Sequence, residues 1–123
     1  MNFKSKKIAV VGASSDQSKY GHKIFKDLKR GGYAVWPVNP KGGLLLGDTV
    51  YKSLSELPSK PDIVISVVPP EITEKIVEEC NILGIKHIWM QPGSESEKAV
   101  KKAKEYEIET TAACFMVSNK IWD

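Results

Sequence analysis

The chain has 123 residues and a formal net charge of +3, a length that suits one domain with a single core. Its apolar fraction of 41% and charged fraction of 27% are typical of an ordinary globular protein in water. No apolar run approaches the ~20 residues of a membrane span. The positive charge is too small and too scattered to indicate nucleic-acid binding.

The N-terminal residues and the cysteines indicate the compartment. Residues 1–7 contain lysines, but no apolar segment as long as the h-region of a signal peptide follows them, so we expect no secretory signal. Cys80 and Cys114 are far apart in the sequence and indicate neither a disulfide framework nor a metal site. We therefore predict a cytoplasmic protein with reduced cysteines, without a bound metal and without a membrane partner.

The first motif is a strand that leads into a turn of small residues. Residues 8–11 form an unbroken apolar run, as expected for a central parallel strand covered on both faces. Gly12 ends the run, Ala13–Ser15 are small, and a helical pattern begins at about Tyr20. Because N–H groups at a helix start attract anions, the predicted ligand of this turn is a phosphate.

The turn departs from the G-x-G-x-x-G fingerprint of dinucleotide-binding proteins, since no glycine lies between Gly12 and Gly21. A tight turn that holds only water is therefore an equal alternative at this point.

The end of the second strand separates two classes of ligand. Residues 33–38 predict this strand, and NAD-binding folds usually carry an acidic residue at its end for the ribose hydroxyls. Here Asn39 occupies that place, Pro40 and Lys41 follow, and no carboxylate occurs before Asp48. This pattern argues against NAD and favours a ligand with additional phosphate.

The middle of the chain continues the alternation of strands and helices. We expect a short edge strand within residues 44–51 and a brief helix over 53–56, which has capping-box spacing. Residues 62–68 predict a second fully apolar strand. It ends at Pro69-Pro70, where Pro70 suits the first turn of the next helix.

The remaining elements complete the pattern. Gly84 ends the helix that begins at Pro70, residues 87–90 predict a strand, and a helix opens at Ser94. The last strand is expected over 110–115, and the tail from residue 118 is expected to be loosely attached, with docking of Trp122 as the alternative.

Strands that alternate with helices predict a three-layer, doubly wound α/β fold with a parallel sheet. The expected order of the six predicted strands is 3-2-1-4-5-6. In such folds, ligands bind beyond the carboxyl ends of the strands. Four segments are expected to meet there in one cleft: Gly12–Ser15, Asn39–Lys41, Val67–Pro70 and Gln91–Gly93.

Five motifs in this order, VVGASS, WPVNPKG, VISVVPPE, IWMQPGSE and CFMV, resemble the small single-domain CoA-binding proteins. These proteins have a Rossmann-type fold similar to the N-terminal domain of the succinyl-CoA synthetase alpha subunit. The resemblance extends from about residue 7 to residue 117. It implies one Rossmann-like domain over residues 1–123, with coenzyme A or a short acyl-CoA as the ligand.

The resemblance also implies which positions contact each part of the ligand. The small turn is expected to hold the pyrophosphate, and the Asn-Pro-Lys segment to lie near the adenosine and its 3′-phosphate. The Val-Val-Pro-Pro segment is expected to line the adenine or pantetheine, and the Gln-Pro-Gly turn to face the pantetheine. The predicted site residues are Gly12, Ala13, Ser14, Ser15, Lys19, Tyr20, Asn39, Pro40, Lys41, Val67, Val68, Pro69, Pro70, Gln91, Pro92 and Gly93.

Three side chains have simpler interpretations. Lys19 is equally well explained as a solvated lysine, and Tyr20 as packing at the helix entry. Cys114 is interpreted as a core residue, with a mixed disulfide to the CoA thiol as the alternative.

No set of residues predicts a catalytic nucleophile, a general base or a metal centre. The predicted function is therefore a non-catalytic module that binds CoA as carrier, sensor or regulator, whose protein partner the sequence does not identify. The alternative is a small NAD(P)-dependent oxidoreductase or another nucleotide-binding subunit.

Overall fold

The computed structural model describes residues 3–123; the first two residues of the stretch considered for a secretory signal lie outside this range. Within it, five parallel strands form one sheet in the order β2-β1-β5-β6-β7. The strands are β1 (Lys7–Val11), β2 (Ala34–Val38), β5 (Ile63–Ser66), β6 (His87–Met90) and β7 (Glu109–Ala112).

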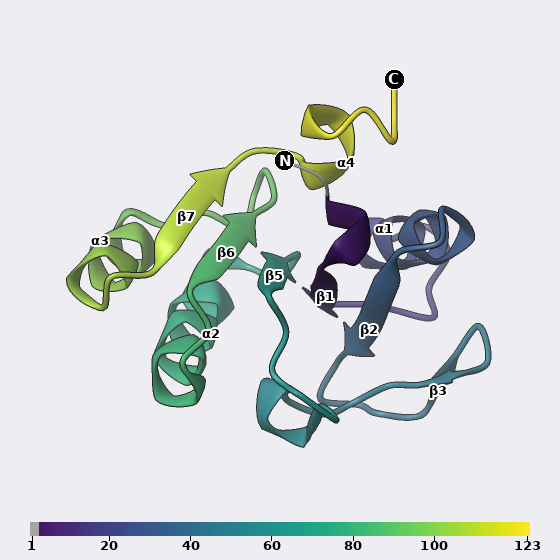
Figure 1. Ribbon diagram of the computed structural model, residues 1–123, viewed down its shortest axis with the longest axis horizontal. Helices are drawn as coiled ribbons and strands as arrows, with labels where there is room; N and C mark the ends of the chain where they lie inside the picture. The colour runs from purple at the N-terminus through teal and green to yellow at the C-terminus, as the bar shows by residue number, and fades with distance from the viewer. Residues whose placement is uncertain (1–2) are drawn as a thin grey trace.

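Helices cover both faces of this sheet (Figure 1). One face packs against α1 (Tyr20–Arg30), α4 (Phe115–Ser118) and the short 3-10 helix η1 (Phe3–Ser5). The other face packs against α2 (Pro70–Leu83) and α3 (Glu97–Glu105). A second 3-10 helix, η2 (Leu54–Glu56), precedes β5. The three-layer α/β/α architecture expected from the sequence is therefore confirmed.

The central strands are those that the apolar runs predict. Ile8–Val11 of β1 and all of β5 are buried, because helices cover the sheet on both sides. Pro70 occupies the first turn of α2, as expected, and Gly84 ends that helix with a left-handed φ of 75°. No helix within residues 3–123 is long and apolar enough to cross a bilayer.

The edge strand predicted within residues 44–51 does not join the sheet. Two-residue strands, β3 (Leu44–Leu45) and β4 (Asp48–Thr49), pair instead with each other as an antiparallel hairpin. Leu46 and Gly47 have φ values of 51° and 86°, and two consecutive left-handed residues turn a strand back on itself. Within residues 3–123, one parallel bridge connects this segment to the sheet, between Tyr51 and Val38 of β2. The expected order 3-2-1-4-5-6 is thus corrected to a five-strand sheet with a separate hairpin.

The C-terminal end of the chain also differs from the expectation. The last strand ends at Ala112 rather than at Phe115, which is the first residue of α4. The tail is anchored, because Trp122 Nε1 donates a hydrogen bond to Asp27 Oδ2 on α1 at 2.7 Å. α3 begins at Glu97, later than Ser94.

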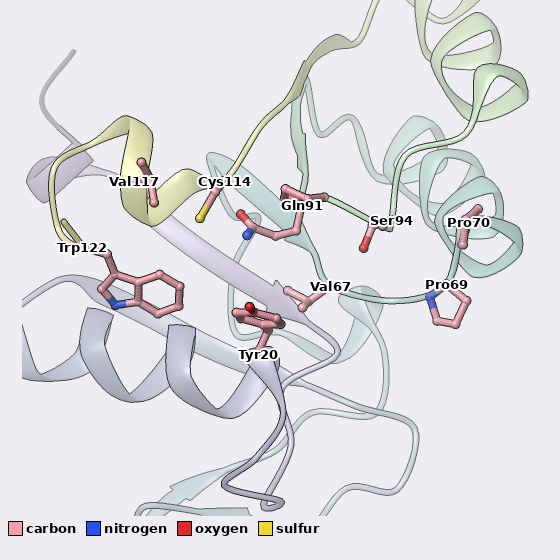
Figure 2. Close-up of a pocket in the computed structure, with 11 residues that line it drawn as sticks. Tyr20, Val67, Pro69, Pro70, Gln91, Ser94, Cys114, Val117 and Trp122 are labelled. Carbon is pink, nitrogen blue, oxygen red and sulfur yellow. The ribbon is translucent and has the colours of Figure 1, made fainter.

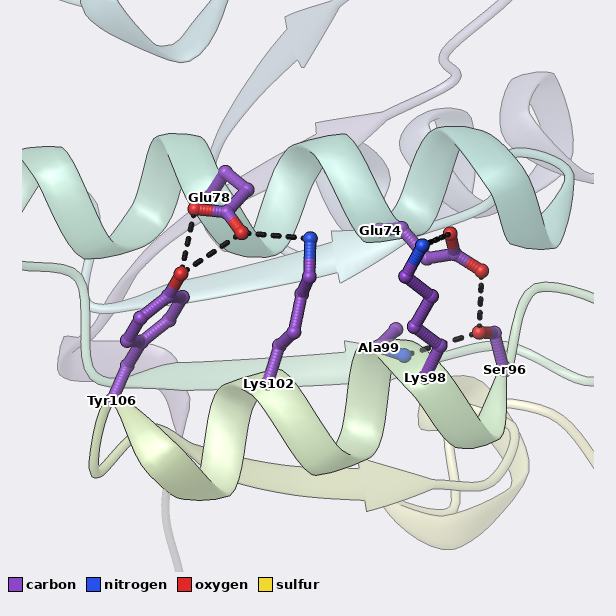
Figure 3. Close-up of polar contacts among 7 residues, drawn as sticks. All are labelled: Glu74, Glu78, Ser96, Lys98, Ala99, Lys102 and Tyr106. Carbon is purple, nitrogen blue, oxygen red and sulfur yellow. Dashed lines mark hydrogen bonds and ion pairs between the residues drawn. The ribbon is translucent and has the colours of Figure 1, made fainter.

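Ser96 explains the later start of α3, because its hydroxyl accepts the Ala99 N–H as the helix cap. The same hydroxyl donates to Glu74 of α2 at 2.8 Å. One turn further along, Glu78 of α2 binds Lys102 at 2.8 Å and accepts the Tyr106 hydroxyl (Figure 3). These contacts fix α2 against α3 on the face of the sheet.

Glu78 predicts a pH-dependent part of the stability. Hydrogen bonds from Lys102 and Tyr106 hold the pKa of its carboxyl below the ordinary 4.5. A carboxyl whose pKa is lowered by folding stabilises the protein above its unfolded pKa and loses this effect as the pH falls through the folded pKa. We expect Glu78→Gln to lower the melting temperature at pH 7, and the difference from wild type to shrink as the pH is lowered from 7 toward 3.

Thermal unfolding followed by circular dichroism at both pH values measures this difference. Glu79→Gln is the matched control, because Glu79 lies beside Glu78 on α2 and has no hydrogen-bonding or ion-pair partner within the described residues. A deficit in Glu78→Gln that stays constant from pH 7 to pH 3 would contradict the assignment.

Candidate functional site

The loop after β1 lies in unusually close contact with its neighbours. A Cβ on Gly21, in the first turn of α1, would lie 1.9 Å from the Gly12 carbonyl oxygen. Gly12 has a left-handed φ of 103°, and a Cβ there would lie 2.9 Å from the Val67 carbonyl oxygen. The Gly12 N–H donates to the Val38 carbonyl at 2.9 Å. Backbone packing therefore requires glycine at both positions, independently of any ligand.

Side chains from α1 and from the end of β2 hold the same loop. Asn39 Nδ2 donates to the Ala13 carbonyl at 2.9 Å, and its Oδ1 accepts the Lys41 N–H at 2.9 Å. His22, buried in α1, donates through Nδ1 to the Ser14 carbonyl at 2.8 Å. The amide of Asn39 is thus engaged in positioning the loop and the lysine beside it.

A cavity of about 220 Å³ lies between this loop, the turn after β2 and the β3–β4 hairpin; it is called here the polar cavity. Lys19 and Lys41 place two positive charges on its wall. Asp16 also lines it, and hydrogen bonds from Ser18 lower the pKa of its carboxyl, which therefore stays ionised at neutral pH. Its lining residues are Ala13, Ser14, Ser15, Asp16, Lys19, Asn39, Lys41, Gly42, Leu44, Leu45 and Val50.

A larger cavity of about 620 Å³ lies beyond the carboxyl ends of β5 and β6 and is called here the apolar cavity. The loops after these strands form one wall, while α4 and the tail form the opposite one (Figure 2). Its lining residues are Tyr20, Val67, Pro69, Pro70, Gln91, Pro92, Gly93, Ser94, Cys114, Val117 and Trp122.

The sequence predicts one cleft, whereas the structure divides the predicted residues between these two cavities. Gly12 packs against Val67 and Val68. This contact lies between the polar cavity and the apolar cavity, and it explains why the predicted residues are divided. The polar cavity contains Ala13, Ser14, Ser15, Lys19, Asn39 and Lys41. The apolar cavity contains Tyr20, Val67, Pro69, Pro70, Gln91, Pro92 and Gly93. Gly12, Pro40 and Val68 line neither cavity.

Gln91 is the polar side chain whose orientation in the apolar cavity is fixed. It is only 5% exposed, and its Oε1 accepts the Phe115 N–H at 2.7 Å. That bond identifies which end of the amide is oxygen, so Nε2 is the end that points into the cavity (Figure 2). Within residues 3–123, this N–H group has no hydrogen-bond partner.

The two cysteines have different environments. Cys80 is buried in the core as expected, and its burial raises the pKa of the thiol. Cys114 packs against the core but is only partly buried and lines the apolar cavity, so it is not the fully buried residue that was expected. The reason is that β7 ends before Cys114, which instead precedes α4.

Several residues around the cavities are not among those predicted. Ser94 directly follows the predicted Gln91–Gly93 turn, whereas Val117 and Trp122 reach the apolar cavity through the return of the chain after β7. Gly21 had a usable signal, because in dinucleotide-binding folds one glycine permits close packing of helix and strand. Among residues 3–123, no group of histidine, cysteine or carboxylate side chains could hold a metal ion.

Three comparisons relate the chain to known proteins. A family model described as "CoA binding domain" matches residues 6–120. The alpha subunit of ADP-forming acetate–CoA ligase II from Pyrococcus furiosus is 36% identical over 107 residues, which cover 84% of this chain and 23% of that subunit. The present chain is much shorter than the acetate–CoA ligase chains that it matches, and it spans 11% to 23% of their length.

Solved structures share the fold. A conserved hypothetical protein from Pyrococcus furiosus superposes with a TM-score of 0.87 and 39% identity, covering 92% of this chain and 98% of that one. The dinucleotide-forming acetyl-coenzyme A synthetase 1 of Ca. Korarchaeum cryptofilum, solved with phosphate and ADP, gives a TM-score of 0.79 at 30% identity. That match covers 90% of this chain and 26% of the synthetase.

The contact between Gly12 and Gly21 predicts a large effect of a single methyl group. In Gly21→Ala the new Cβ would overlap a backbone oxygen at 1.9 Å, which no side-chain rotation can relieve. We expect a loss of about 3 kcal/mol in the free energy of unfolding, at the upper end of overpacking effects. Urea unfolding measures it.

Gly31→Ala provides the control for this substitution. Gly31 follows the same helix with a right-handed φ of −76°, and the nearest atom to its Cβ would be a Tyr33 ring carbon at 3.1 Å. We expect a change within about 1 kcal/mol there. Equal effects at the two positions would show that the loop moves freely away from α1.

Proposed function

The chain belongs to the CoA-binding domain family, and we propose that it binds one molecule of coenzyme A across the polar and the apolar cavity. The observation that carries this proposal is the pairing of two chemically different cavities at the carboxyl edge of one sheet. Coenzyme A has the matching division, with a phosphorylated adenosine at one end and an uncharged pantetheine arm at the other.

The polar cavity suits the phosphorylated end of the ligand. Lys19 and Lys41 supply positive charge, and the loop after β1 supplies the hydroxyls of Ser14 and Ser15. In the described part of the chain no side chain caps the N-terminus of α1, whose N–H groups and dipole favour an anion. Asn39 stands where an NAD-binding fold has its carboxylate, which supports CoA over NAD.

The apolar cavity suits the pantetheine arm. Val67, Pro69 and Pro92 supply apolar walls, and buried Gln91 and Ser94 supply polar groups for the amides of the arm. A mostly apolar pocket with few fixed polar groups is the usual form of a small-molecule site.

The proposed role is binding rather than catalysis, as a carrier, sensor or regulatory module. The ligase that shares 36% identity is named as an alpha subunit, and this chain matches only a part of that subunit. We therefore also propose that the chain acts together with a protein partner, which supplies whatever chemistry follows binding.

Lys41 provides the direct test. Calorimetry is expected to give micromolar binding of CoA and clearly weaker binding of NAD. If Lys41 pairs with the 3′-phosphate, Lys41→Ala will cost about 1–3 kcal/mol for CoA, as for a charge-assisted hydrogen bond. The cost for dephospho-CoA, which lacks that phosphate, will be far smaller.

The control is Lys86→Ala, because exposed Lys86 precedes β6 at the opposite edge of the sheet. Equal losses for CoA and dephospho-CoA in Lys41→Ala would mean that this lysine supplies only general positive potential. Binding of NAD as tight as that of CoA would contradict the choice of ligand.

A further inference from the structure

The helix α2 uses only part of its circumference for contacts within the domain. Thr73, Val77 and Cys80 are its buried residues. Glu74 and Glu78 bind side chains of α3 and its flanking residues (Figure 3). The side of α2 that lies opposite the buried residues faces solvent.

Four side chains on this outer side form what is called here the α2 stripe: Ile72, Lys75, Glu79 and Ile82. Spacings of three, four and three residues keep them on one face of the helix. Ile82 is 81% exposed and Ile72 is 38% exposed. Lys75 and Glu79 lie one turn apart, but neither forms a hydrogen bond or an ion pair within the described residues.

The α2 stripe is complementary to its own reversed copy. Two copies of α2 can pack antiparallel with Val77 of each at the centre of the pair. Ile72 of one copy then lies beside Ile82 of the other, and this contact occurs at both ends. In the same register, Lys75 of each copy lies beside Glu79 of the other. A parallel pair in register would instead place each charge beside a like charge.

We propose that the α2 stripe is the contact between two copies of this chain in a symmetric, antiparallel dimer. A two-fold axis requires one patch that complements itself, and the order apolar, positive, negative, apolar meets this requirement. The stripe has one charge of each sign, so it offers no excess charge to a strongly acidic or basic partner. Charge complementarity therefore favours a second copy of this chain as the occupant.

The size of the stripe makes this dimer weak. α2 has 14 residues and is about 21 Å long, so two such helices bury less than the ~800 Å² per partner of a stable interface. We expect a dissociation constant of roughly 0.1–1 mM. The chain is then monomeric at the micromolar concentrations used for circular dichroism.

The dimer leaves both apolar cavities open. Pro70 begins α2 and lines the apolar cavity of its own copy. In an antiparallel pair the two helix starts lie at opposite ends, so the two cavities are far from each other. Pairing of the chains therefore needs no ligand, and CoA titrations are expected to give the same affinity for monomer and dimer.

Sedimentation equilibrium at about 20 μM and at about 1 mM, concentrations on either side of the expected dissociation constant, tests the pairing. The average mass of the wild type is expected to rise from that of one chain toward that of two. Lys75→Glu gives a stripe with two negative charges, and Glu79→Lys one with two positive charges. Each variant alone is expected to associate at least ~10-fold more weakly, because both ion pairs become like-charge contacts.

An equimolar mixture of the two charge variants is the sharpest arm of the experiment. When a Lys75→Glu chain meets a Glu79→Lys chain, both ionic positions again carry opposite charges, so the mixture is expected to associate about as well as wild type. Lys26→Glu is the matched control, because Lys26 lies on α1 at the other face of the sheet, and it is expected to dimerise like wild type. Circular dichroism verifies that each variant is folded.

Three results would overturn the inference. The first is a wild-type chain that stays monomeric at the higher concentration. The second is a dimer whose affinity is unchanged in Lys75→Glu, because its interface would then lie elsewhere. The third is a mixture that associates no better than the separate variants, because the charges of the stripe would then meet a different surface or a different protein.

Discussion

The contact between the Gly12 carbonyl and the first turn of α1 is the constraint on which both cavities depend. Glycine at position 21 lets the helix approach the loop so closely that a methyl group there would overlap the oxygen. Gly12 itself lies against the loop after β5 and bonds to the end of β2. Three strand ends are thereby held around one short loop, with the polar cavity on one side of it and the apolar cavity on the other.

The second constraint is the return of the chain after the last strand. Phe115 packs on Phe3 and Trp89 with ring centroids 5.0 Å apart in each case, so α4 is part of the core. The backbone N–H of Phe115 fixes the side chain of Gln91, and the tail then contacts α1 through Trp122. Packing of the core thus determines both the orientation of the Gln91 amide and the position of α4 and the tail beside the apolar cavity.

Much of the fold follows from local patterns. The sequence directly predicts β1 and β5, because their apolar runs require burial on both faces. It also predicts the start and the end of α2, because the proline and the glycine there restrict or free their own backbone. The edge strand predicted within residues 44–51 does not join the sheet because Leu46 and Gly47 adopt left-handed conformations, which the apolar pattern of this segment does not reveal.

The site is less predictable, because its parts meet only in three dimensions. Strand ends predict the edge at which the cavities open, and the motifs identify most of their lining. Neither indicates that the packing of Gly12 against Val67 separates the polar from the apolar part. An aromatic residue in the tail indicates that Trp122 could dock, but its partner, Asp27, lies 95 positions earlier and a single sequence does not identify it.

The most direct test of a single ligand spanning both cavities uses fragments of CoA and amide chemical shifts of the isotope-labelled protein. Adenosine 3′,5′-bisphosphate is expected to shift only amides around the polar cavity, such as Ser14 and Lys41, and pantetheine only those around Gln91 and Ser94. Intact CoA is expected to shift both groups together, with one shared affinity. Shifts from CoA confined to one cavity, or two groups that saturate at different concentrations, would contradict the account.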